Sequence, residues 1–136
     1  MKNNRRTSRE LALKWLYQTD FKGNASVAEL ASLYSPDVSE DSFSYAQELI
    51  QGIDKNLAAI DEKIQAASRH WKLDRMASVD KNIMRLSTYE MAFAAELVPH
   101  QVAISEALEL AKLYGTSDST SFVNGVLDQV AQKIKS

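Results

Sequence analysis

The amino-acid sequence predicts an all-α protein, and three features of its 136 residues support this prediction. Four glycines and two prolines are few, which favours long regular elements over the tight turns of a sandwich or barrel. Apolar residues recur at intervals of three and four along most of the chain, which is the spacing of amphipathic helices. The hydrophobic content of 45% allows a packed core in a chain of single-domain size. We expect one all-α domain of about seven helices.

Capping-box patterns mark the starts of the first two predicted helices. Residues 7–10 form the first pattern, with Thr7 as the N-cap, and the helix that follows should stop near Gly23. Residues 26–29 form the second pattern and open a short helix, which residues 35–37 should end because they contain a proline.

A long third helix is predicted from about Ser42. Its apolar residues repeat with steps of four and three, so they share one face that would pack against partner helices. These residues are Ala46, Ile50, Ile53, Leu57, Ile60 and Ile64. Gly52 interrupts this helix at a cost of about 1 kcal/mol relative to alanine, and its missing side chain would permit close approach of a neighbour.

The polar residues 68–78 are the only plausible seam in the chain, and they would separate sub-bundles at about 1–67 and 68–136. Three helices should follow, the first capped by Ser78, the second lying between Pro99 and Gly115, and the third reaching the C-terminal region. Their expected buried positions are Val79, Ile83, Leu86, Phe93 and Leu97, then Ile104, Ala107, Leu108 and Ala111, then Val123, Val126, Leu127, Val130 and Ile134.

Several classes of function are disfavoured by what the sequence lacks. It has no cysteine, and His70 and His100 stand alone, so we expect no metal and no cofactor. No nucleophile motif or glycine-rich phosphate loop is present, so we expect no enzymatic activity. No apolar run approaches the roughly 20 residues that span a bilayer, and no export signal is evident, so the expected location is the cytoplasm, away from membranes.

Charge is distributed unevenly along the chain, although the net charge is only −2. Residues 1–14 carry five cations and one anion, whereas the remainder carries eleven cations and seventeen anions. The cations of this arm are Lys2, Arg5, Arg6, Arg9 and Lys14. Two interpretations stay open, namely an ordinary solvated N-terminal region and an arm that contacts phosphates.

A run of hydroxyl side chains at residues 116–121 precedes the last helix and forms a polar hinge. Asp118 is expected to act as the N-cap of that helix. Phe122 lies about 100° from the buried stripe centred on Val123, so it could stack on an unpaired base or pack against a neighbouring helix. Asn124 lies on the opposite flank of the stripe and could read a base edge or cap a carbonyl. The serines of the hinge could solvate the loop or donate to phosphates.

A group of basic and aromatic residues precedes the helix that is predicted to begin at Ser78. It consists of Arg69, His70, Trp71, Lys72 and Arg75. We interpret Trp71 as an anchor in the core in preference to a platform for base stacking.

The chain resembles the NusB family of bacterial transcription antitermination factors. Residues 98–112 read VPHQVAISEALELAK and residues 114–128 read YGTSDSTSFVNGVLD, both close to family motifs. Further matches are Asp80, Arg85, Leu86, Tyr89 and Glu90, and, at the front, Arg5, Arg6, Arg9, Glu10, Leu11, Ala12, Leu16, Tyr17 and Gln18. The resemblance covers nearly the whole chain and is strongest from residue 79 onward.

The resemblance implies a fold of two small helical bundles packed at an angle and a non-catalytic role in transcription regulation. Family members bind boxA RNA together with the small-subunit ribosomal protein NusE, and the complex helps RNA polymerase to resist termination. The implied RNA-binding residues are Arg5, Arg6, Arg9, Tyr17, Asp118, Ser119, Ser121, Phe122 and Asn124. The implied NusE-binding residues lie on one helix and are Asp80, Met84 and Glu90.

The chain departs from the family pattern in its basic residues. Its arginine run is thinner than in many relatives, and Gln101 and Ser121 stand where a basic residue is common, while Ser105 replaces a common asparagine. Each lost cation removes a phosphate contact, so we expect weak RNA binding by the isolated chain and stronger binding with NusE.

Two alternatives stay open beside an RNA-binding adaptor. The chain could be a protein-only scaffold with little RNA binding, or the RNA-recognition module of an RNA methyltransferase. Some relatives also form homodimers that would cover the RNA surface.

Overall fold

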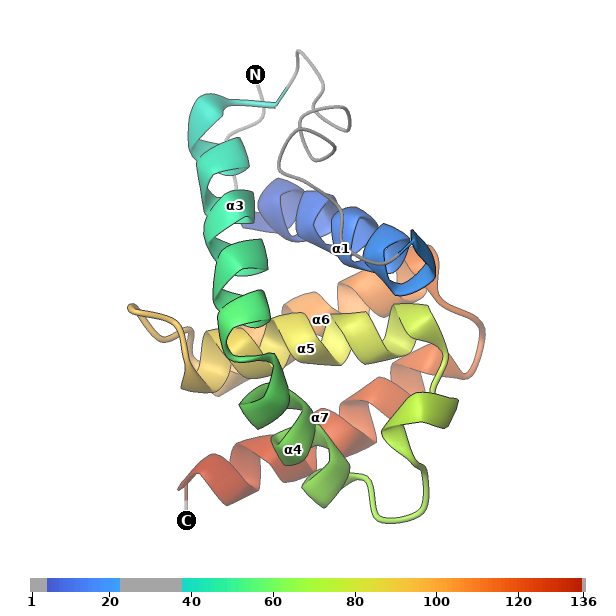
Figure 1. The fold of residues 1–136 in the computed structure, drawn as a ribbon. Helices are drawn as coiled ribbons and strands as arrows, with labels where there is room; N and C mark the ends of the chain where they lie inside the picture. Colours follow the sequence, from blue (N-terminus) through green and yellow to red (C-terminus); the bar gives the residue numbers. More distant parts are fainter. Residues whose placement is uncertain (1–4, 23–37, 136) are drawn as a thin grey trace. The chain divides into compact units, whose positions relative to one another are not determined.

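The computed structural model describes residues 5–22 and 38–135, which form six α-helices and one 3-10 turn (Figure 1). In chain order these are α1 (Arg5–Lys22), α3 (Glu40–Lys55), α4 (Leu57–Ala67), η1 (Leu73–Arg75), α5 (Ser78–Ala92), α6 (His100–Tyr114) and α7 (Ser119–Lys135). The predicted all-α class is therefore confirmed. The short helix predicted after residues 26–29 lies outside the described residues. No described helix is both long enough and apolar enough to cross a membrane.

The chain divides into two compact units, Met1–Gln51 and Gly52–Ser136, and the division falls near the C-terminal end of α3. The polar segment at residues 68–78 had indicated a later division, at about residue 67. The difference arises from α4, which packs against α5 and α7 and so belongs to the second unit. Its apolar residues Ile60 and Ile64 are fully buried there.

The first unit contains α1 and most of α3. A small buried cluster consists of Leu11 of α1, Val38 just before α3, and Ala46 of α3, and Phe43 packs against it. The hydroxyl of Ser8 donates a hydrogen bond of 2.7 Å to the backbone carbonyl of Ser42, which joins the two helices.

Helix starts in this unit differ from the prediction. Arg5 already belongs to α1, so Thr7 lies inside the helix and the predicted capping box does not mark the start of the helix. The actual start of α3 is Glu40, where the Ser39 hydroxyl accepts a hydrogen bond of 3.1 Å from the Ser42 amide. Ser39 therefore has the capping geometry that serines favour at helix N-termini.

The long helix predicted from about Ser42 is two helices that are separated at Asn56. The side-chain amide of Asn56 donates a hydrogen bond of 2.8 Å to the Gly52 carbonyl, while the Asn56 carbonyl accepts from the Ile60 amide at the start of α4. The backbone angles of Asn56, φ −111° and ψ 16°, depart from regular helical values, and this residue separates α3 from α4. The apolar face nevertheless continues, because Ile53 and Ile60 are both buried.

The second unit packs α4, α5, α6 and α7 against one another. Ala77 precedes α5 and Ser78 is its first helical residue, so the predicted Ser78 cap is wrong; the Ser78 carbonyl accepts from the Asn82 side chain instead. The predicted burial of Leu97 is also wrong, since α5 ends at Ala92 and Leu97 is exposed in the connection that follows. Helical periodicity predicts burial only while the helix continues.

A partly buried ion pair connects α4 to α5. The guanidinium of Arg85 donates to both carboxylate oxygens of Asp61, from Nε at 2.8 Å and from Nη2 at 2.9 Å. The two side chains are only 11% and 22% exposed. A third donor of Arg85, Nη1, bonds the Asn82 side chain at 3.0 Å, so the guanidinium is held in a network.

Candidate nucleic-acid interface

The hinge between α6 and α7 is folded around the hydroxyl of Ser119. This oxygen accepts a hydrogen bond of 2.9 Å from the Thr116 amide, and the Ser119 amide donates to the Thr116 carbonyl at 3.1 Å. Ser119 is buried, so its hydroxyl positions the hinge and does not face a ligand. Gly115 lies so close to the Ser119 side chain that a Cβ atom on residue 115 would collide with it.

Of the other residues predicted to bind RNA from the hinge and the first turns of α7, three are exposed, namely Asp118, Ser121 and Asn124. Asp118 occupies the predicted N-cap position, directly before α7, and its backbone carbonyl accepts from the Phe122 amide at 3.1 Å. These side chains offer a carboxylate, a hydroxyl and an amide to solvent. Such groups can hydrogen-bond base edges, whereas only the hydroxyl and the amide can donate to a phosphate.

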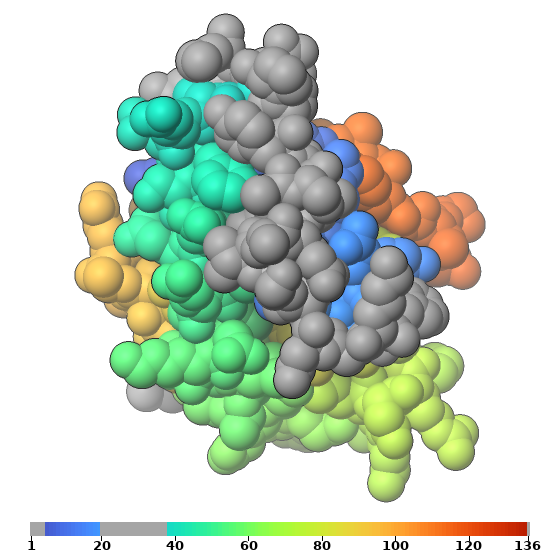
Figure 2. All heavy atoms as spheres, turned by 45° about the horizontal axis from the view of Figure 1, so that its top comes forward, coloured from blue at the N-terminus to red at the C-terminus, as the bar shows by residue number. Residues whose placement is uncertain are grey.

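Phe122 and Trp71 form an aromatic pair beside this hinge. Their ring centroids are 6.4 Å apart and the ring planes are almost perpendicular, at 85°. Phe122 is half-buried, while Trp71 is exposed, so the interpretation of Trp71 as a core anchor is wrong. The connection between α4 and α5, which is yellow-green in Figure 2, carries side chains that project from the surface. The polar hinge and the basic and aromatic group around Trp71 therefore meet within the second unit.

The other residues predicted to bind RNA lie on α1, in the first unit. Arg5, Arg6 and Tyr17 are exposed, whereas Arg9 is buried. The guanidinium of Arg5 lies 3.7 Å from the centroid of the Tyr45 ring, a cation–π contact with α3. Sequence reasoning missed Tyr45, because one tyrosine on an amphipathic helix gives no signal that distinguishes it from a packing residue.

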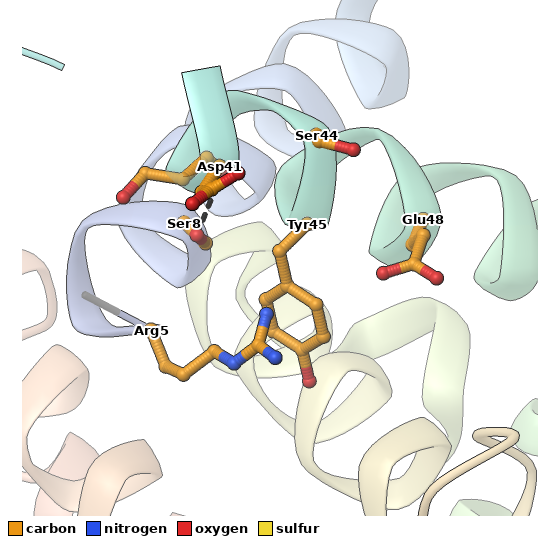
Figure 3. A pocket seen from close by; sticks show the side chains of 7 residues that line it. Arg5, Ser8, Asp41, Ser44, Tyr45 and Glu48 are labelled. Carbon is orange, nitrogen blue, oxygen red and sulfur yellow. Dashed lines mark hydrogen bonds between the residues drawn. The ribbon is translucent and has the colours of Figure 1, made fainter. Parts of the chain in front are cut away.

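Arg5 and Tyr45 line a polar pocket of about 370 Å³ between α1 and α3. Figure 3 shows Arg5 reaching from α1 across the Tyr45 ring, with Asp41 and Glu48 of α3 on either side of the tyrosine. The remaining lining residues are Ser8, Ser42 and Ser44. Two carboxylates beside one guanidinium make the pocket poor for a phosphate and better suited to groups that donate hydrogen bonds, such as base amino groups.

The three residues expected to bind a partner protein lie on α5. Met84 and Glu90 are buried, and Asp80 is half-buried. Met84 and Glu90 thus offer no surface in this structure and belong to the interior of the protein. The motif positions that suggested them are spaced around the helix and carry no information on which face is accessible.

Comparison with known proteins agrees with the resemblance of the sequence motifs. Residues 6–132 match the model of the NusB family. Transcription antitermination protein NusB of Bdellovibrio bacteriovorus is 48% identical over 128 residues, which cover 94% of this chain and 95% of the relative. The relative from Sorangium cellulosum is 40% identical over 131 residues, covering 96% of this chain and 93% of its own.

Solved structures agree with this result. A structure of T. maritima NusB has a TM-score of 0.88 and 37% identity, covering 98% of this chain and 94% of that chain. A crystal structure of antitermination factors NusB and NusE in complex with dsRNA has a TM-score of 0.77 and 26% identity, covering 95% of this chain and 96% of that chain. The family model and the relatives above 30% identity span almost the entire sequence. The chain belongs to the NusB family.

Proposed function

We propose that this chain is a non-catalytic RNA-binding adaptor of transcription antitermination. Together with the small-subunit ribosomal protein NusE it recognises boxA in ribosomal RNA leader transcripts and helps RNA polymerase to resist termination. The observation that carries this proposal is the 48% identity to the NusB protein of B. bacteriovorus across nearly the whole chain. The similarity to a NusB that has been solved with NusE and dsRNA supports the two binding partners.

In the second unit, RNA contact is assigned to the exposed side of the hinge and the first turns of α7. Phe122 supplies an aromatic face, and Asp118, Ser121 and Asn124 supply hydrogen-bonding groups for base edges. Ser119 contributes by folding the hinge, since its hydroxyl is buried against the Thr116 amide. This surface has little positive charge, so its contribution is to recognise bases and not to attract the RNA backbone.

In the first unit, the arm supplies the positive charge. Arg5, Arg6 and Tyr17 are exposed on α1, and the guanidinium of Arg5 also contacts the Tyr45 ring. Arg9 is buried, so it is the least suited of the three arginines to a direct phosphate contact. Few phosphate contacts should give weak binding by the chain alone, with NusE supplying the remaining affinity.

Titration of boxA RNA over a range of salt concentrations, with and without NusE, tests this proposal. We expect weak binding by the isolated chain, strong binding with NusE, and a shallow salt dependence, because each phosphate contact adds roughly 0.7 to the logarithmic slope for a single strand. Tight RNA binding without NusE would contradict the proposal that NusE supplies the remaining affinity. No binding with NusE present would contradict the function itself.

Of the residues suggested for NusE contact, only Asp80 is retained in the proposal, because it is the one with partial exposure. Its carboxylate lies at the start of α5, and one of its oxygens is buried without a hydrogen-bond partner among the described residues. Asp80→Asn should weaken NusE binding without affecting RNA binding. Unchanged affinity for NusE would show that the NusE-binding surface does not include this end of α5.

A protein-only scaffold is the second candidate function. It is favoured by the acidic surroundings of Arg5, where Asp41 and Glu48 line the same pocket and oppose a phosphate. Ultraviolet crosslinking of the chain to boxA RNA in the presence of NusE separates the two candidates. Crosslinks on the chain support the adaptor, whereas crosslinks on NusE alone support the scaffold.

A further inference from the structure

Trp71 exposes a large apolar side chain to water, which is energetically unfavourable. Its side chain is 57% exposed, although tryptophans normally bury most of their surface. Its ring and the ring of Phe122 meet edge to face, so this contact leaves at least one face of the indole uncovered by Phe122. An exposed aromatic face beside a proposed RNA-binding residue is suited to stacking on a planar ligand.

The loop that carries Trp71 is fixed by one side chain of α4. The Gln65 amide nitrogen donates to the carbonyls of Ser68 and Trp71, at 3.1 and 2.9 Å, and the Gln65 oxygen accepts from the Leu73 amide at 2.8 Å. The Ser68 hydroxyl also donates to the Trp71 carbonyl, at 3.2 Å. The backbone is therefore held on both sides of Trp71. This order lowers the entropy that a ligand would otherwise have to remove on binding.

The charge around Trp71 is opposite to that of most of the chain. Arg69, Lys72 and Arg75 are all exposed in the same connection, against one exposed acid, Asp74. A flat aromatic surface among exposed cations suits a nucleic-acid strand, because the cations can contact phosphates while the ring contacts a base. A peptide partner of ordinary composition would not need this combination.

We propose that Trp71 is a base-stacking platform, so that the RNA strand continues from Phe122 across the connection between α4 and α5. This inference rests on the proposed function and adds a second stacking residue to its surface. Arg69 and Lys72, the basic neighbours of Trp71, contact the phosphates on either side of the stacked base. Gln65 is a positioning residue that holds the platform and does not touch the RNA.

The angle between the two rings gives this platform a preference for single strands. Because the ring planes differ by 85°, bases that stack on Phe122 and on Trp71 cannot stack on each other. The strand must turn between them, which a splayed single strand can do and a continuous helix cannot. Duplex RNA of the same sequence should therefore gain nothing from Trp71.

The direct test observes Trp71 itself in the full chain bound to NusE. Trp15 is the only other tryptophan of this chain, so in a Trp15→Phe protein the tryptophan fluorescence that the chain contributes comes from Trp71, and NusE alone gives the background. Adding single-stranded boxA RNA should quench this fluorescence, whereas duplex RNA of the same sequence should not. Absence of quenching in a protein that binds the RNA would overturn the platform and leave the proposed function intact.

Affinity measurements with matched variants complete the test. Trp71→Ala should weaken boxA binding by roughly 5- to 150-fold, the usual effect of losing one stacked base, and Trp71→Phe should retain most of the affinity. Leu97→Ala is the matched control, because Leu97 is also 57% exposed but follows the opposite end of α5. Gln65→Ala should weaken binding less than Trp71→Ala, and should have no further effect when Trp71 is already alanine.

Several outcomes overturn the proposal in distinguishable ways. Normal affinity in a folded Trp71→Ala protein removes Trp71 from the site. An equal loss for duplex RNA indicates phosphate contact without stacking. Loss of NusE affinity without RNA present assigns Trp71 to a protein interface. If the wild-type chain with NusE binds no RNA at all, both this inference and the proposed function fail.

Discussion

The ring of Tyr89 on α5 occupies the space that a side chain at Gly52 would need. The three atoms nearest to a Cβ built on Gly52 all belong to this ring and all lie closer than real Cβ contacts allow. The close approach that the sequence suggested for this glycine is therefore confirmed. A residue without a side chain lets α5 pack directly against the backbone at the end of α3.

Gly52→Ala should destabilise the protein by about 1–2 kcal/mol in chemical unfolding, because the overpacking penalty exceeds the gain in helix propensity. Gly125→Ala on α7 is the matched control, since nothing lies within 4 Å of the added Cβ. This control should stabilise the protein by up to about 1 kcal/mol. Equal effects of the two substitutions would show that helix propensity alone decides the result at Gly52.

Removal of the Asp61 carboxylate should destabilise the protein through the Arg85 guanidinium that it leaves behind. The charge stays in a site where only 11% of the arginine side chain is exposed, so Asp61→Ala should cost about 3 kcal/mol of unfolding free energy. Asp61→Asn should cost less, because one acceptor oxygen remains. The exposed pair of Glu109 and Lys112, at 3.7 Å, provides the control, and Glu109→Ala should change the free energy by less than about 0.5 kcal/mol.

The sequence predicted those helix ends that are determined by the residues next to them. Pro99 precedes α6 and Gly115 follows it, as predicted, because both residues act on their own stretch of backbone. The break at Asn56 was not predicted, because the apolar period continues across it, with Ile53 and Ile60 both buried. A period identifies the buried face but not the continuity of the helix.

The candidate site was predictable to the extent that it depends on the geometry of one helix. The off-stripe position of Phe122 followed from helical geometry, and the structure leaves its ring half-buried. The exposure of Trp71 and the contact of Arg5 with Tyr45 depend on which elements meet in space, so no local pattern indicated them. The burial of Glu90 was also missed. Acidic residues are seldom fully buried, so its residue type predicted an exposed position.

The hinge before α7 should lose its shape when the Ser119 hydroxyl is removed. Ser119→Ala leaves the Thr116 amide without the acceptor that lies at 2.9 Å, so we expect a loss of about 1 kcal/mol in unfolding free energy. Ser121→Ala is the control, because Ser121 is a neighbouring serine with an exposed side chain. It should alter stability by less than about 0.5 kcal/mol, and a loss equal to that of Ser119→Ala would contradict the assignment of the hinge to Ser119.

Phe122→Ala should weaken binding of boxA RNA in the presence of NusE by about 1–3 kcal/mol, since the variant loses an aromatic face for a base. Thermal unfolding of the variant must accompany the titration, because Phe122 is half-buried and also contacts Trp71. A double-mutant cycle with Trp71→Ala separates the two roles. Coupling in stability without RNA measures the contact between the rings, about 0.5–1.5 kcal/mol, while coupling in RNA affinity measures cooperation between the two platforms. A folded Phe122→Ala protein with unchanged affinity would remove Phe122 from the RNA surface.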